Sequence, residues 1–108
     1  MYIPDRGDVI WLDFDPQRGR EIQKMRPALT VSPANYNEKT GLGLFIPITS
    51  HVKAYPFEVL IQHDLVTGAM LCDQIKSLDW KARTAQYVIT LSPTQMQQVV
   101  DKLKLLLF

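Results

Sequence analysis

A short polar segment, residues 19–27, carries side chains that suit chemistry on a phosphate ester. It holds Glu21, Lys24 and Arg26, and Arg26 comes directly before Pro27, which favours an extended backbone at the arginine. The planar fork of an arginine can hold two phosphate oxygens at once and keeps its charge throughout. A polar segment between two strand-like stretches is a suitable place for a site, because loops on a rigid scaffold often carry function.

Further polar groups could complete such a site. Thr49 lies near the end of an alternating stretch, and Asp73 and Gln74 interrupt an apolar run, where a carboxylate and an amide need partners or a function. RNA supplies its own nucleophile, the 2′-hydroxyl, so these groups would need only to move protons and stabilise charge on the phosphate. The spacing of these residues in the sequence also allows a purely structural role, in which Arg26 pairs with Glu21 or Asp73 and Thr49 is an ordinary strand residue.

Three aromatic residues could stack on unpaired bases, namely Phe14, Tyr55 and Trp80. Each such contact contributes about 1–3 kcal/mol. Phe14 lies on the aliphatic face of its strand and is better explained by core packing, whereas Tyr55 stands in a polar connection beside Lys53. Lys53 and Lys76 could hold phosphates, although single lysines are usually just exposed.

Composition argues against several classes of protein. Twelve Lys and Arg against eleven Asp and Glu leave a net charge of +1, so no global field indicates a nucleic-acid partner. Cys72 is the only cysteine, and His51 and His63 lack the spacing of paired zinc ligands, so we expect no disulfide, no metal and no other cofactor. The charged N-terminus and the lack of a long apolar run predict a cytoplasmic protein with no membrane span.

Hydrophobic periodicity predicts a mainly β fold with a C-terminal helix, in a single domain over residues 1–108. Ser92 as the cap, Pro93 as the first helical residue and Gln95 predict where the helix begins. Residues 33–43 are rich in turn formers. Strand-like stretches cover residues 7–15, 28–32, 44–50, 57–61 and 84–91, with an apolar run at 69–75 and a short amphipathic segment at 76–83. Five or six short strands and one helix indicate a small, partly closed, SH3-like barrel.

Alternation also predicts which side chains share a face of a strand. If the aliphatic residues of 44–50 face the core, Thr49 lies on the other face with Phe45. In the last strand, one face is expected to hold Ala85, Tyr87, Ile89 and Leu91.

Ten short motifs, in order and at matching spacings, are similar to those of the MazF/PemK (ChpB-like) toxins of bacterial type II toxin-antitoxin systems. They are residues 7–16 (GDVIWLDFDP), 19–21 (GRE), 26–28 (RPA), 32–33 (SP), 36–37 (YN), 39–41 (KTG), 47–50 (PITS), 55–59 (YPFEV), 73–77 (DQIKS) and 80–83 (WKAR). The chain resembles this family over nearly its whole length.

The resemblance implies a barrel of the MazF/CcdB type and an endoribonuclease that cuts single-stranded mRNA at short sequences without a metal, leaving a 2′,3′-cyclic phosphate and a 5′-hydroxyl. The family's catalytic arginine and threonine fall on Arg26 and Thr49. Its loop carboxylate falls on Glu21, which would accept a proton or orient Arg26. We further expect the substrate to be bound by Lys24, Ser50, Lys53, Tyr55, Asp73, Gln74 and Lys76.

The resemblance also implies a homodimer that binds RNA between its subunits, and an antitoxin whose flexible acidic tail covers that surface. One branch of the family has a histidine at the position of Arg20 and an arginine at that of Leu71, so histidine-based proton transfer of that kind is not expected here. Two alternatives remain open: a toxin of the same fold that poisons DNA gyrase, and a barrel that binds RNA or peptides without catalysis. The first usually has a tryptophan near the C-terminus, whereas none follows Trp80.

Overall fold

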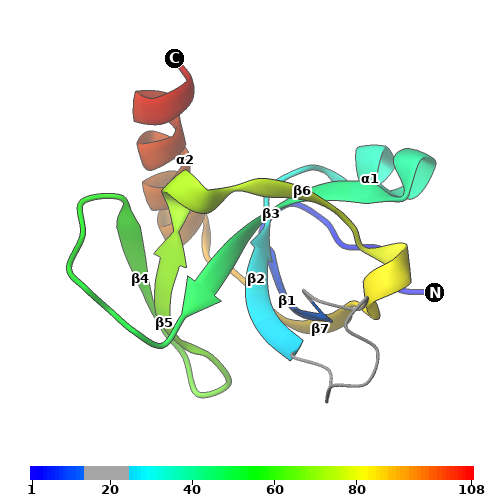
Figure 1. The fold of residues 1–108 in the computed structure, drawn as a ribbon, viewed down its shortest axis with the longest axis horizontal. Coiled ribbons are helices and arrows are strands. Elements are labelled where there is room, and N and C mark those ends of the chain that lie inside the picture. The colour runs from blue at the N-terminus through cyan, green and yellow to red at the C-terminus, as the bar shows by residue number, and fades with distance from the viewer. Residues whose placement is uncertain (14–24) are drawn as a thin grey trace.

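The computed structural model describes residues 1–13 and 25–108 (Figure 1). The predictions made for Phe14, Arg20, Glu21 and Lys24 therefore lie outside the described residues. The strands are β1 (Asp8–Asp13), β2 (Met25–Thr30), β3 (Leu42–Thr49), β4 (Glu58–Gln62), β5 (Thr67–Leu71), β6 (Lys76–Asp79) and β7 (Gln86–Thr90). The helices are α1 (Ala34–Thr40), α2 (Pro93–Leu107) and two 3-10 turns, Cys72–Gln74 and Lys81–Arg83.

The strands form one strongly curled antiparallel sheet in the order β4-β5-β3-β2-β1-β7. β3 is the strand on which the sheet bends, because its first half pairs with β6 at Leu42 to Phe45 and its end pairs with β5 at Ile48 and Thr49. Figure 1 shows the two halves of the sheet diverging from β3, with α2 beside β4 and β5. The prediction of a small, partly closed β fold with a C-terminal helix is confirmed.

The bend creates two hydrophobic clusters. The first cluster lies under α2 and includes Val9, Ile46, Val99 and Leu103. The second cluster includes Ile10, Leu12, Phe45 and Trp80. β1 contributes to both clusters, because successive side chains of a strand point to opposite faces and both faces of this strand are covered.

Helix α2 begins where the sequence predicts. The Ser92 side chain accepts a hydrogen bond from the Gln95 backbone N–H at 3.2 Å, and Pro93 is the first helical residue. The Gln95 side chain donates Nε2 to the carbonyl oxygen of Leu60 at 2.7 Å, which ties the first turn of the helix to the edge strand β4. Among the described residues, no helix has the length and apolar character needed to span a membrane.

Two predicted elements are wrong. Residues 33–43 contain helix α1, which Gly41 ends in a left-handed conformation with φ of 73°. The apolar run 69–75 is not one strand, because β5 ends at Leu71 and Asp73 and Gln74 lie in an exposed 3-10 turn. For the amphipathic segment 76–83 the sequence predicted no element type, and the structure shows that it begins with strand β6, which pairs with β3.

Two predicted strand faces also need correction. A register shift between β1 and β7 pairs Val9 with Ile89 but Ile10 with Tyr87, so Tyr87 is exposed while Ile89 packs against the first cluster. In β3, Ile46 and Ile48 are buried as expected, but Leu44 is 38% exposed. Thr49 is half-buried at the end of the strand.

Trp80 does not stack on a ligand, because its side chain is 3% exposed in the second cluster. Its indole Nε1 donates to the backbone carbonyl of Asn37 at 3.1 Å. Asn37 is fully buried and its side-chain Nδ2 donates to the carbonyls of Pro4 at 2.7 Å and Ser32 at 3.0 Å. The Ser32 hydroxyl donates to Asn37 Oδ1 at 2.6 Å and accepts from the Leu44 N–H at 2.8 Å. These bonds join α1 to the second cluster.

A second buried polar group lies at the start of β1. Asp8 accepts hydrogen bonds from the Tyr2 hydroxyl at 2.6 Å, the Asp5 N–H at 3.0 Å and the Thr90 hydroxyl at 3.0 Å. Burial, followed by the hydrogen bond to Asp8, raises the pKa of the Tyr2 hydroxyl well above its usual value. The carboxylate thus holds the N-terminal segment against β7.

Candidate functional site

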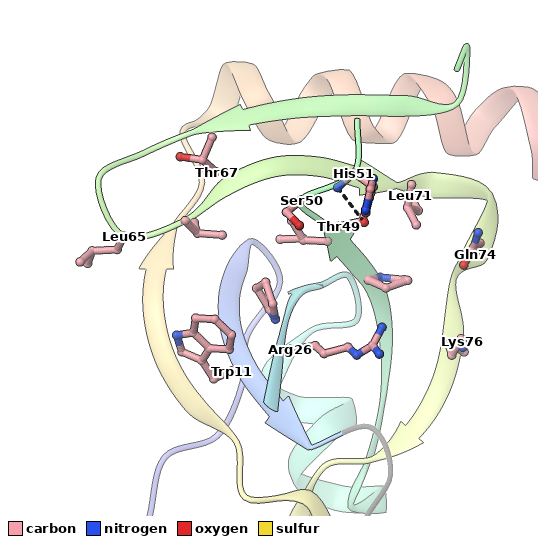
Figure 2. A pocket seen from close by; sticks show the side chains of 14 residues that line it. Trp11, Arg26, Thr49, Ser50, His51, Leu65, Thr67, Leu71, Gln74 and Lys76 are labelled. Carbon is pink, nitrogen blue, oxygen red and sulfur yellow. Dashed lines mark hydrogen bonds between the residues drawn. The ribbon is translucent and has the colours of Figure 1, made fainter. Parts of the chain in front are cut away.

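A cavity of about 620 Å³, here called the first cavity, opens where β1, β2 and β3 face β5 and β6. Figure 2 shows Trp11 on one side, Lys76 and Gln74 on the other, and Arg26 and Thr49 between them. The side chains that line it come from five strands and their connections. Two cations, Arg26 and Lys76, are among them.

β2 holds Arg26 at the rim of this cavity. Arg26 pairs with Leu12 of β1 and is exposed, whereas Ala28 to Thr30, further along the same strand, are buried. Pro27 follows it and pairs with Trp11. The pairing of β2 with β1 therefore fixes the backbone of Arg26, while its long side chain lies in the cavity (Figure 2).

Thr49 lies at the last residue of β3, paired with Ala69 of β5. Its Oγ1 accepts a hydrogen bond from the His51 backbone N–H at 3.1 Å (Figure 2). A hydroxyl that accepts in this way keeps its own proton for donation, for example to a phosphate oxygen. The Thr49 backbone also packs closely against Gly68, because a Cβ at Gly68 would collide with the Thr49 carbonyl oxygen.

A second cavity, of about 660 Å³, adjoins the first. The two share Thr49, His51, Leu71 and Gln74. The shared residues join the two cavities into one surface, along which an extended chain could lie.

The second cavity carries an aromatic ring between charged groups. Its other lining residues include Lys53, Tyr55, Glu58 and Asp73. The Lys53 backbone N–H contacts the Glu58 carboxylate at 3.2 and 3.3 Å. A hydrogen bond to the Asp73 carboxylate and its negative charge raise the pKa of the Tyr55 hydroxyl. The Tyr55 ring lies 5.8 Å from that of Phe57, centroid to centroid.

Most of the residues predicted for the site that are described meet at this joined surface. Arg26, Ser50 and Lys76 line the first cavity, Lys53, Tyr55 and Asp73 line the second, and Thr49 and Gln74 line both. Asp73 interacts with Tyr55, so it is a partner of the aromatic ring. Glu21 and Lys24 lie outside the described residues.

Sequence reasoning missed two residues here, Trp11 and His51. His51 lines both cavities and follows the Thr49-Ser50 pair directly, a position that could have drawn attention to it. Trp11 is 36% exposed although it belongs to a strand covered on both faces. Only the fold shows that its ring lies beside the cavity.

Catalysis by a cysteine thiol and catalysis by a bound metal find little support in the described residues. Burial raises the pKa of the Cys72 thiol to about 11, which keeps the sulfur protonated and unreactive. Within residues 1–13 and 25–108, no group of three or more His, Cys, Asp or Glu side chains comes together as a set of metal ligands.

Comparison with known proteins decides the family. Residues 5–107 match the family described as PemK-like, MazF-like toxin of type II toxin-antitoxin system. The chain belongs to the PemK-like and MazF-like toxins. Among curated members, it is 44% identical over 106 residues to the endoribonuclease toxin MazF of Escherichia coli (strain K12), covering 98% of this chain and 96% of the relative. It is 32% identical over 108 residues to endoribonuclease PemK of Escherichia coli, covering 95% of this chain and 81% of the relative.

Solved MazF structures have the same fold. MazF of Deinococcus radiodurans (Form-I) superposes with a TM-score of 0.87 at 44% identity, covering 99% of this chain and 98% of that one. The MazE-MazF structure from the same organism (Form-II) gives a TM-score of 0.87 at 41% identity, covering 99% and 97%. The resemblance to MazF/PemK toxins that the motifs indicate is confirmed.

Proposed function

We propose that this MazF-like chain is a sequence-specific endoribonuclease toxin that inhibits translation and growth by cutting single-stranded mRNA. The observation that carries the proposal is the meeting of Arg26 and Thr49 in one cavity, although 23 positions separate them in the sequence. Curated members of the family are named endoribonucleases. The chain would act in the cytoplasm as a single toxin domain.

The chemistry is an in-line attack of the RNA 2′-hydroxyl on the adjacent phosphorus. The bond from phosphorus to O2′ forms, the bond to O5′ breaks, and the products are a 2′,3′-cyclic phosphate and a 5′-hydroxyl. Arg26 holds the phosphate oxygens, on which negative charge grows, and the Thr49 hydroxyl donates a hydrogen bond to one of them. Glu21 accepts the 2′ proton or orients Arg26. These groups carry the reaction without a metal.

Binding of the rest of the RNA falls to the joined surface. Tyr55 stacks on an unpaired base, while Lys53 and Lys76 attract phosphates. Ser50, Asp73 and Gln74 supply hydrogen-bonding groups for base edges, and Lys24, two positions before Arg26 in the sequence, adds a cation.

The same surface would take an inhibitor. Arg26, Lys53 and Lys76 line the two cavities, so an acidic and flexible antitoxin tail would compete with RNA for them. Solved MazE-MazF structures of a relative support an antitoxin as the expected partner. We expect a homodimer, because the end of α2 exposes Leu105, Leu106 and Leu107.

Cleavage of a long single-stranded RNA in excess EDTA tests the proposal. We expect discrete cuts at one short sequence with cyclic-phosphate ends. Thr49→Ala and Arg26→Ala variants, shown to be folded, should lose cleavage, while Thr49→Ser should keep most of it because its hydroxyl remains. Intact RNA after incubation with the folded parent chain would overturn the function. Full activity in both alanine variants would overturn the site.

A further inference from the structure

Release of the 5′ product requires a proton that the residues assigned so far supply poorly. When the bond from phosphorus to O5′ breaks, O5′ leaves as an alkoxide unless an acid protonates it. Arg26 is a poor acid because a guanidinium does not lose its proton in proteins. Thr49 is a neutral hydroxyl that is suited to donating a hydrogen bond. A separate proton donor is therefore needed near the scissile phosphate.

His51 occupies the right place for such a donor. It lines both the first and the second cavity, and its backbone N–H is bonded to Thr49 Oγ1 at 3.1 Å. Figure 2 shows the His51 side chain beside Thr49, among the side chains that line the cavity with Arg26. A phosphate held by Thr49 and Arg26 would thus lie next to the His51 ring.

The other ionisable groups around His51 are less suited to this task. Within residues 1–13 and 25–108, those that line the two cavities with it are Arg26 of β2, Lys76 of β6, Glu58 of β4, Asp73 of the 3-10 turn, and Lys53 and Tyr55 of the connection to β4. Histidine is the side chain that ordinarily gains and loses a proton between pH 5 and 8, whereas carboxylates and lysines do so well outside that range. The Tyr55 hydroxyl is a still weaker acid than an ordinary tyrosine, because Asp73 raises its pKa.

We propose that His51 is the general acid of the reaction and donates a ring proton to O5′. The inference rests on the proposed ribonuclease function and adds a residue that the motifs did not assign. The 2′-hydroxyl proton leaves to a proton acceptor, the bond from phosphorus to O2′ forms, and the bond to O5′ breaks as the imidazolium becomes imidazole. Solvent then returns a proton to His51, which restores the starting state.

The test compares His51→Asn with His63→Asn on two RNA substrates. His63 is a matched control, because it lines a different cavity, together with Gln95. The His63 Nδ1 atom accepts a hydrogen bond from the Leu65 backbone N–H at 3.0 Å, and the side-chain oxygen of an asparagine could accept the same bond. One substrate is ordinary RNA, and the other carries sulfur in place of O5′ at the cleavage position. A thiolate leaves without protonation, so an acid is not needed for the second substrate.

On ordinary RNA, we expect His51→Asn to cut about 100-fold more slowly or worse, which is the usual contribution of a general acid. On the sulfur substrate, it should cut within a few-fold of the parent chain. The parent rate on ordinary RNA should fall at high pH, because the acid must be protonated, and His51→Asn should lack this fall. His63→Asn should match the parent chain on both substrates.

Other outcomes separate the inference from the function on which it rests. Equal cleavage of ordinary RNA by the parent chain and His51→Asn overturns the role of His51 and leaves the ribonuclease function intact. An equal loss on both substrates also overturns it, because a group that only binds or positions RNA would act in that way. If the folded parent chain cuts neither substrate, the proposed function fails and the inference fails with it.

Discussion

Polar side chains in this molecule fall into two regions that use hydrogen bonds differently. Asp8 and Asn37 are buried and bond to other parts of the chain through most of their polar atoms. Around the two cavities, Arg26 and Lys53 are exposed and Thr49 is half-buried, accepting a bond while keeping its proton to donate. The first region fixes the shape of the fold, and the second keeps its bonding capacity for a ligand.

The contrast predicts that the two regions respond to mutation in opposite ways. Arg26→Lys keeps the positive charge but loses the planar fork that can hold two oxygens. We expect cleavage to slow by about 100-fold, as when one preorganised donor is removed from an active site. The free energy of unfolding, measured in urea, should change by less than about 0.5 kcal/mol, since the side chain is exposed. A large loss of stability would show that Arg26 belongs to the structural region after all.

Asn37→Ala should do the reverse. It leaves the carbonyls of Pro4 and Ser32 without a donor in a buried site, so we expect the free energy of unfolding to fall by about 2–4 kcal/mol. The exposed Asn35 of the same helix is the control, and Asn35→Ala should stay within about 0.5 kcal/mol of the parent chain. RNA cleavage per folded Asn37→Ala molecule, measured well below its melting temperature, should be unchanged. A drop in that rate would mean that α1 also positions the cavity.

Tyr2→Phe should give the smallest effect, and one that depends on pH. The hydroxyl donates to Asp8, so its loss should cost about 1 kcal/mol at pH 7. The pKa of Tyr2 is raised in the folded chain, so its contribution is complete below the ordinary value near 10 and declines as the pH rises beyond it. Urea titrations at pH 7, 9 and 10.5 should therefore show a difference between parent and variant that is constant up to about 9 and then shrinks. A constant difference at all three pH values would argue against a proton held in the folded chain.

Local signals in the sequence predicted the elements that depend on neighbouring residues. Helix α2 was predictable because the capping hydrogen bond joins Ser92 and Gln95, which are three residues apart. The extended conformation of Arg26 follows from the proline after it, and the structure places it in a strand. The meeting of Arg26 with Thr49 in one cavity could be anticipated only through the family motifs, because it depends on how the strands are ordered.

The errors arose where distant residues decide the structure. Helix α1 lies within residues 33–43, a stretch rich in turn formers, and its buried Asn37 is bonded to Pro4, 33 positions away. Trp80 stands between two charged residues and looks exposed in sequence, yet its indole bonds to Asn37, 43 positions away. The place of His51 between two cavities follows from the pairing of β3 with β5, which no local pattern specifies.

The bond from Gln95 to Leu60 has a bearing on self-association. Among the described strands, β4 is an edge strand that pairs only with β5, and Leu60 on it is largely exposed, a combination that in other proteins attracts a strand of another chain and starts aggregation. The Gln95 amide already occupies the outward carbonyl of Leu60 at the middle of that strand. By closing one acceptor on an open edge, the C-terminal helix helps to keep copies of this toxin from joining edge to edge.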